Sequence, residues 1–153
     1  DICESAGLPA YEISNHARPG AQSRHNLIYW NAGDYAGIGP GAHGRLTIDG
    51  KRYAVEAPRA PSEWLKLVES GGPAESRDSI AAHGQATEYL IMGLRVQDGI
   101  NLERYAEISG QQLDRNIINQ LISLDKISIR DGQLAATAEG RLVLDAVISA
   151  LAP

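Results

Sequence analysis

The spacing of apolar residues differs between the two parts of the chain. Up to about Gly71-Gly72-Pro73, short alternating stretches typical of strands are separated by turns rich in glycine and proline. After that point apolar residues recur with the period of a helix. Short strands are predicted at residues 10–14 and 35–38, a hairpin at 45–48 and 52–55 around Asp49-Gly50, and a short helix or tight turn at 24–31.

The later part of the chain predicts mainly helices. Ser62, Asn101 and Thr137 are residues of the types that cap helix starts, and the Asp-Gly pair at Asp131-Gly132 predicts another hairpin. Apolar positions place Leu142, Val143, Ala146 and Val147 on the inward side of the last helix, and Ile117, Ile118, Leu121 and Leu124 along an earlier one. The predicted helices span residues 62–70, 79–96, 101–108, 114–124 and 137–151, and the hairpin strands span 126–130 and 133–135.

These elements predict an α/β protein with a winged-helix-like order, helix–helix–helix–hairpin–helix, in its second part. We expect three regions: residues 1–60 with the strands and hairpin, a helix and linker at 61–77, and a mainly helical domain at 78–153. We expect residues 78–153 to fold independently.

Composition narrows the class of protein. With 153 residues and 43% hydrophobic content, the chain falls in the globular range. No apolar run approaches the ~18–20 residues of a membrane span. Cys3 is the one cysteine, so the chain cannot form an internal disulfide or supply the several thiolates of an iron–sulfur cluster. The first residues lack a signal pattern and are typical of a chain that begins within a helix, so we expect further sequence upstream.

The segment His25-Asn26-Leu27-Ile28-Tyr29-Trp30 is the first candidate site. On a helix, His25 and Tyr29 share a face and Trp30 lies one residue round. Imidazole is a good axial ligand for heme iron, aromatic rings pack on a porphyrin plane, and the nearby Arg18 and Arg24 suit propionates. The alternative is that both aromatic residues belong to the core and that His25 forms only local hydrogen bonds.

The second candidate is the glycine-rich stretch of residues 37–44. It contains a G-x-G-x-x-G pattern from Gly39 to Gly44, but a dinucleotide fingerprint must open a helix, and a strand and turn are predicted next. We therefore reject a Rossmann site. Glycines this close together indicate that the backbone approaches either a ligand or another strand, and the sequence does not decide between them.

The winged-helix order raises the question of DNA binding. Residues 78–153 contain 6 Lys and Arg against 10 Asp and Glu, a net charge of −4, within a chain of net charge −5. The predicted recognition helix has one basic residue, Arg115. Few cations are present to neutralise phosphates, so a structural or docking domain is favoured and nucleic acid is not an expected partner. Glu12 has no partner visible in the sequence.

Several motifs in order resemble the later part of the HemW-type heme chaperones, which are relatives of oxygen-independent coproporphyrinogen III oxidase in the radical S-adenosylmethionine family. The H-N-x-x-Y-W motif at residues 25–30 is specific to the HemW branch and is associated with heme binding. The other motifs are Tyr11-Glu12-Ile13-Ser14-Asn15, Ala17-Arg18-Pro19-Gly20, Gly37-Ile38-Gly39-Pro40-Gly41-Ala42-His43, Gly93-Leu94-Arg95, Asp98-Gly99-Ile100 and Thr137-Ala138-Glu139-Gly140.

The resemblance implies the last strands of a partial radical S-adenosylmethionine (β/α) barrel, followed by the C-terminal domain shared by that group. It implies that His25, Asn26, Tyr29 and Trp30, with Arg24 nearby, bind heme and that His25 is the iron ligand. It also implies a contact with S-adenosylmethionine through Gly39, Gly41, Ala42 and His43. The 4Fe-4S cluster would belong to the full-length protein, because its cysteines are missing here.

The leading hypothesis is a cytoplasmic heme chaperone that binds heme and delivers it to acceptor proteins, with a homodimer as an open alternative. The competing hypothesis is an oxygen-independent coproporphyrinogen III oxidase, which decarboxylates propionates by radical chemistry. A third is a winged-helix DNA-binding module. Whether the full-length protein is an enzyme stays open at this point.

Overall fold

The computed structural model describes residues 2–152, and the chain divides into two units by its internal contacts. One unit comprises residues 1–32 and 82–153, and the other comprises residues 33–81. Each is described by itself. The mixed α/β class is confirmed, whereas the predicted division into residues 1–60, 61–77 and 78–153 stays a prediction.

The unit of residues 33–81 is a three-stranded antiparallel sheet with one helix, α3 (Pro61–Glu69). The hairpin is confirmed, since Asp49 and Gly50 both have positive φ (50° and 73°) in the turn between β1 (His43–Ile48) and β2 (Lys51–Glu56). The third strand was not predicted: Ser79 was assigned to a helix start and residues 76–78 to no element, but they pair with β2, with Tyr53 opposite Ser79. The strands of this sheet lie in the order β1 (His43–Ile48), β2 (Lys51–Glu56) and β3 (Ser76–Ser79).

Two predictions for this unit were wrong. The segment 35–38 forms no strand, and only Tyr35 makes an isolated antiparallel bridge, to Arg45. Ser62 does not cap α3, because the cap position is Ala60, which makes no side-chain bond, and Pro61 occupies the first turn. Proline has no backbone N–H, so this position of the first turn needs no hydrogen-bond acceptor.

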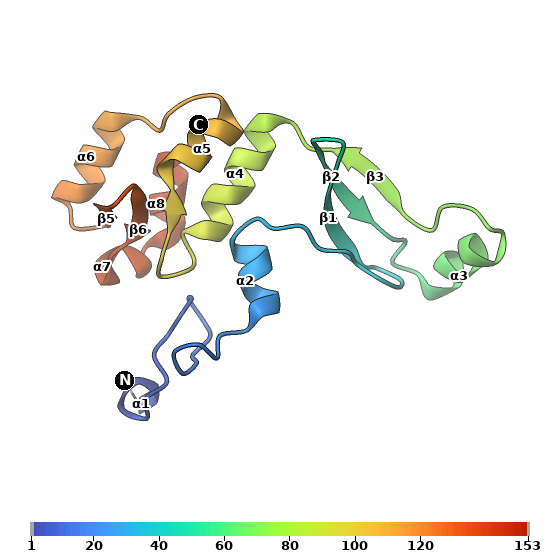
Figure 1. Cartoon of the computed structure of the whole chain (residues 1–153), viewed down its shortest axis with the longest axis horizontal. Coiled ribbons are helices and arrows are strands. Elements are labelled where there is room, and N and C mark those ends of the chain that lie inside the picture. The colour runs from blue at the N-terminus through green and yellow to red at the C-terminus, as the bar shows by residue number, and fades with distance from the viewer. Residues whose placement is uncertain (1, 153) are drawn as a thin grey trace. The chain divides into compact units, whose positions relative to one another are not determined.

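The other unit contains the hydrophobic core. Figure 1 shows α4 (Ala82–Gly93) lying along α5 (Leu102–Ser109), with α6 (Arg115–Ser123) beside the small sheet and α8 (Leu144–Leu151). The order of elements and the sheet order β4-β6-β5 agree with the predicted winged-helix arrangement. The elements are α1 (Ile2–Ser5), α2 (Arg24–Trp30), α4 (Ala82–Gly93), β4 (Ile100–Asn101), α5 (Leu102–Ser109), α6 (Arg115–Ser123), β5 (Ile127–Arg130), β6 (Gln133–Ala136), α7 (Ala138–Arg141) and α8 (Leu144–Leu151).

Side-chain caps fix the starts of three of these helices, and two of the caps, Asn101 and Thr137, were predicted from the sequence. The side-chain oxygen of Asn101 accepts from the backbone N–H of Arg104 at 2.8 Å. The carboxylate of Asp114 accepts from the N–H of Asn116 at 2.7 Å. The hydroxyl of Thr137 accepts from the N–H of Gly140 at 3.0 Å. Each bond satisfies an N–H that has no partner within its helix.

Other expectations for this unit were wrong. Residues 10–14 form no strand but only isolated bridges, including one from Glu12 to Val96. The long helix begins at Ala82 and not at residue 79, and the last helix is broken into α7 and α8. The break turns Leu142 and Val143 outward, 78% and 44% exposed, and Ala146 is exposed too, whereas Val147 is buried as predicted. Leu124, 55% exposed, lies past the end of α6.

Candidate functional site

The helix α2 positions the first group of predicted site residues. Ser23 caps it, its hydroxyl accepting from the N–H of Asn26 at 3.3 Å. One turn separates His25 from Tyr29, and the tyrosine hydroxyl lies 2.8 Å from Nε2 of His25. Their rings meet edge to face, with centroids 4.6 Å apart and planes at 87°. The hydrogen bond therefore fixes the orientation of an imidazole that is otherwise on the surface.

A neighbouring face of α2, one residue further round the helix, holds it against the rest of its unit. Trp30 lies partly buried, with the guanidinium of Arg95 5.7 Å from its ring centroid. Asn26 donates from its amide to the hydroxyl of Tyr11 at 3.4 Å. The structure thus brings His25 and Tyr29 together on one side and turns Asn26 and Trp30 toward neighbouring segments.

The indole N–H of Trp30 is buried and has no hydrogen-bond partner within the described residues 2–152. A buried donor without an acceptor costs free energy, about 1–3 kcal/mol. Such groups are found where an acceptor from outside the chain completes the site, or where a ring is held in place by packing alone.

The residues on α2 fit a flat metalloporphyrin. A histidine side chain enclosed in the interior would leave no room for the macrocycle, but His25 is exposed. Beside it Ile28 is 41% exposed and offers an apolar surface. Arg24 and Arg18 are exposed as well, so guanidinium groups are available for carboxylates. An accessible imidazole, an apolar surface and nearby cations form a suitable set of groups for heme.

The glycine-rich stretch lies in the unit of residues 33–81. Its glycines permit a close approach between backbone segments and left-handed backbone conformations. A Cβ on Gly37 would stand 2.3 Å from the carbonyl oxygen of His43, so the close approach inferred from the sequence is made to another backbone segment. Gly39 and Gly41 have positive φ (100° and 72°), where other residues are strained. The His43 ring is exposed and lies 3.8 Å from the carboxylate of Glu56. A contact between these residues and S-adenosylmethionine stays a prediction.

The sequence did not indicate that Glu12 is buried. The side chain is 1% exposed, and its Oε1 accepts from Ser14 at 3.2 Å and from the amide of Asn15. Its Oε2 has no hydrogen-bond partner among residues 2–152. Burial lowers the pKa of Arg141 from its ordinary value, and the charge of Glu12 acts on it in the opposite direction. The sequence feature that could have indicated the burial of Glu12 is the pair of polar residues at positions 14 and 15, because a buried carboxylate needs hydrogen-bond donors close by.

The described residues contain no cluster for an iron–sulfur centre. Cys3 is the one cysteine, and no group of three or more His, Cys, Asp or Glu side chains among residues 2–152 is arranged to hold a metal ion. The donor set therefore does not fit a 4Fe-4S cluster. Within the same range, none of the helices has the length and apolar content that crossing a bilayer requires.

Comparisons with known proteins agree with the motif pattern. Residues 80–143 match the family model of the HemN C-terminal domain. The chain is 32% identical over 158 residues to radical S-adenosyl methionine domain-containing protein 1, mitochondrial, of Danio rerio, covering 96% of this chain and 36% of that protein. It is 32% identical over 151 residues to heme chaperone HemW of Bacillus subtilis, covering 96% and 39% respectively.

A solved structure supports the fold. Coproporphyrinogen III oxidase (HemN) from Escherichia coli, a radical SAM enzyme, superposes with a TM-score of 0.68 over 99% of this chain and 38% of its own, at 13% identity. At that identity the match shows the fold alone. The chain spans less than two fifths of the length of these relatives.

Proposed function

Because the chain is a homologue of the HemW heme chaperones and carries a HemN-type C-terminal domain, we propose that the protein binds heme and delivers it to acceptor proteins. The observation that supports this most directly is the exposed imidazole of His25, held at one ring nitrogen by Tyr29. Heme in this proposal is the cargo that the protein transfers.

Each residue of the segment has a proposed part in holding heme. His25 ligates the iron through Nδ1, the ring nitrogen left free by the hydrogen bond between Nε2 and Tyr29, and that bond orients the imidazole. Arg24 and Arg18 pair with the propionates. Asn26 and Trp30 contribute by fixing α2 through Tyr11 and Arg95, so that the ligand helix does not move when heme leaves.

The full-length protein is proposed to bind S-adenosylmethionine and a 4Fe-4S cluster in addition to heme. One cysteine in 153 residues supplies no cluster, so we derive no radical chemistry from these residues. Gly39, Gly41, Ala42 and His43 are the proposed contact with S-adenosylmethionine. We place the protein in the cytoplasm, with heme-acceptor proteins as partners and a homodimer as a further proposal.

The fold shared with coproporphyrinogen III oxidase favours a second candidate, the oxidase activity itself. It predicts that full-length, cluster-loaded protein forms the decarboxylated product when given coproporphyrinogen, S-adenosylmethionine and a reductant. An absence of turnover under those conditions eliminates this candidate and leaves heme binding unaffected.

Heme titration followed by Soret absorbance tests the chaperone proposal. We expect the full-length protein to bind heme and His25→Ala to bind it at least about tenfold more weakly, because an axial metal ligand is lost. His83→Ala is the matched control, since His83 is exposed and lies on a different helix, α4. Equal affinity of His25→Ala and the parent protein removes His25 from this role.

Delivery is tested separately with heme-loaded protein and an apo-acceptor. We expect the Soret band of the acceptor to rise as that of the chaperone falls, on mixing in the absence of free heme. Retention of all heme by the donor over hours, while the acceptor takes up free heme, contradicts the delivery step.

A further inference from the structure

A groove in the C-terminal domain lies among α5, α6 and the β5–β6 hairpin, far along the chain from the heme motif. Its volume is about 690 Å³. That size falls in the range of about 300–1,000 Å³ typical of ligand pockets. All of its lining residues belong to one unit, so the groove is a property of this domain alone.

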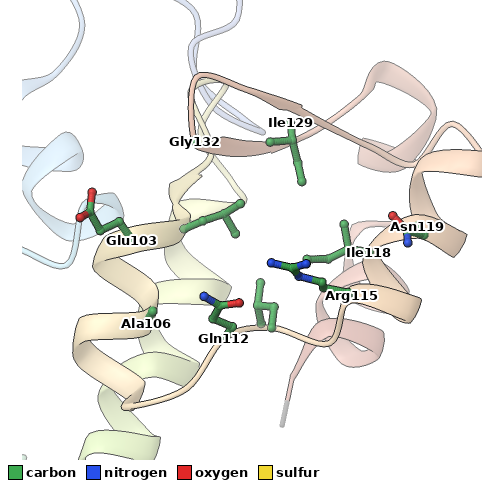
Figure 2. Close-up of a pocket in the computed structure, with 10 residues that line it drawn as sticks. Glu103, Ala106, Gln112, Arg115, Ile118, Asn119, Ile129 and Gly132 are labelled. Carbon is green, nitrogen blue, oxygen red and sulfur yellow. The ribbon is translucent and has the colours of Figure 1, made fainter.

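The groove combines apolar walls with unused polar groups. Leu102, Leu113, Ile118 and Ile129 supply the walls. Figure 2 shows the guanidinium of Arg115 directed into the groove beside the amide of Gln112, with Ile118 and Ile129 close to it. Within residues 2–152, no hydrogen bond or ion pair involves the side chain of Arg115 or of Gln112.

The charges around the groove make one end positive. Arg115 is the one cation that lines it in the described part of the chain. It stands in the first turn of α6, where the helix dipole adds positive potential. The adjacent carboxylate of Asp114 is engaged with the N–H groups of Asn116 and Ile117. The carboxylate of Glu103 points away from Arg115 on the far wall, as Figure 2 shows.

We propose that this groove binds the apolar C-terminal end of a partner protein, with its terminal carboxylate placed against Arg115. A guanidinium recognises a carboxylate by paired hydrogen bonds. The amides of Gln112 and Asn119 both donate and accept, which matches peptide groups, and the leucine and isoleucine walls match apolar side chains. The volume far exceeds what a lone carboxylate fills, and one cation is too few for a nucleic acid backbone.

Titrations followed by two-dimensional 1H–15N NMR of the whole 153-residue chain test this inference. The probes are acetyl-Leu-Ala-Leu with a free carboxylate, its C-terminal amide, acetyl-Leu-Glu-Leu-amide, and hexanoate. We expect the groove amides to shift with a peptide that carries a carboxylate and not with the uncharged amide. The first and third probes distinguish a chain end from an acidic side chain, and the proposal is for a chain end.

Two variants locate the interaction. Arg115→Gln is expected to weaken peptide binding about tenfold, the loss of one charge-assisted contact. Ile129→Ser, at an exposed strand position, is expected to weaken it severalfold. Arg130→Gln is the matched control, because Arg130 is exposed, carries the same charge and does not line the groove.

Five results would overturn the proposal: no shift with any probe, equal shifts with the uncharged amide, equal binding of hexanoate and peptides, shifts with acetyl-Leu-Glu-Leu-amide but not with acetyl-Leu-Ala-Leu, or equal loss in Arg115→Gln and Arg130→Gln. The proposal does not depend on heme binding. Soret titration of the same variants keeps the two questions apart, since Arg115→Gln is expected to leave heme affinity unchanged.

Discussion

The hydroxyl of Tyr29 lies 2.8 Å from Nε2 of His25, and the two rings stand nearly perpendicular on successive turns of α2. A spacing of four residues brings both side chains to one face of the helix. The contact is exposed, so it contributes little to the stability of the fold and acts mainly on the orientation of the imidazole.

Replacing Tyr29 with Phe is therefore expected to weaken heme binding while leaving stability almost unchanged. Partners that orient a metal-binding histidine typically change metal affinity by about 10–100-fold, and we expect the lower end here. Soret titration measures the affinity, thermal melting measures stability, and Tyr53→Phe on β2 serves as control. Tighter binding by Tyr29→Phe would instead mean that the hydroxyl competes with iron for Nε2.

Replacing Trp30 with Phe separates packing from hydrogen bonding at the buried end of α2. Phe keeps an aromatic ring next to Arg95 but removes an indole N–H that has no acceptor among residues 2–152. If the ring acts by packing, the free energy of unfolding should fall by no more than about 1 kcal/mol, because an unsatisfied donor is removed along with some contact area. Chemical denaturation measures this.

The Trp30→Phe variant also tests whether the indole N–H contacts heme directly. A Trp30→Phe protein of normal stability that binds heme several times more weakly would assign the N–H group a direct part in holding the ligand. Unchanged affinity is the expected outcome, in keeping with the proposed role of Trp30 in fixing the helix.

Gly140 is predicted to be one of the least replaceable residues of the C-terminal domain. A Cβ at this position would lie 1.8 Å from the carbonyl oxygen of Lys126, a backbone atom that cannot move without disturbing β5. Gly140→Ala is expected to cost about 3 kcal/mol or more by overpacking. Gly110→Ala, which meets nothing within 4 Å but has a φ of 74°, is the comparison and should cost about 1 kcal/mol. Equal melting temperatures for the two variants would contradict this.

Residues 78–153 are expected to fold without the rest of the chain. The hydrophobic core is built from buried residues between Ala86 and Leu151, and residues before this region contribute only peripheral contacts such as Ala32. The isolated segment should show one cooperative thermal transition with helical circular dichroism. A broad, non-cooperative melt would show that the earlier segments, held by the bridge from Glu12 to Val96, are required.

The elements that could be predicted from the sequence are those fixed by local chemistry. The Asp-Gly pairs at 49–50 and 131–132 form hairpin turns, with Asp49 and Asp131 at positive φ. Asn101, Asp114 and Thr137 cap helices by bonds to residues two or three positions ahead. In each case the deciding interaction lies within a few residues of the chain, so the pattern contains the necessary information.

The features that could not be predicted depend on partners distant in the chain. Residues 76–79 are polar and lack a strand pattern, yet they pair with β2, which begins at Lys51. Glu12 is buried through contacts with Val96 and an electrostatic interaction with Arg141. The accessibility of His25, on which the site depends, is likewise set by how α2 packs on α4 and not by the motif itself.

The stability of the C-terminal domain should fall in alkaline solution because of Tyr105. This side chain is 1% exposed, and burial raises its pKa above the ordinary value of 10.0. Below pH 10 both folded and unfolded chains keep the phenol proton, so the contribution of the buried phenol to the free energy of unfolding is fully present. Above it the unfolded chain loses the proton first, and the free energy of unfolding decreases by at most about 1.4 kcal/mol per pH unit until the folded pKa is reached. Melting temperatures from pH 8 to 11 should therefore drop less steeply in Tyr105→Phe than in the parent chain, and parallel curves would show that the phenol stays accessible to base in the folded protein.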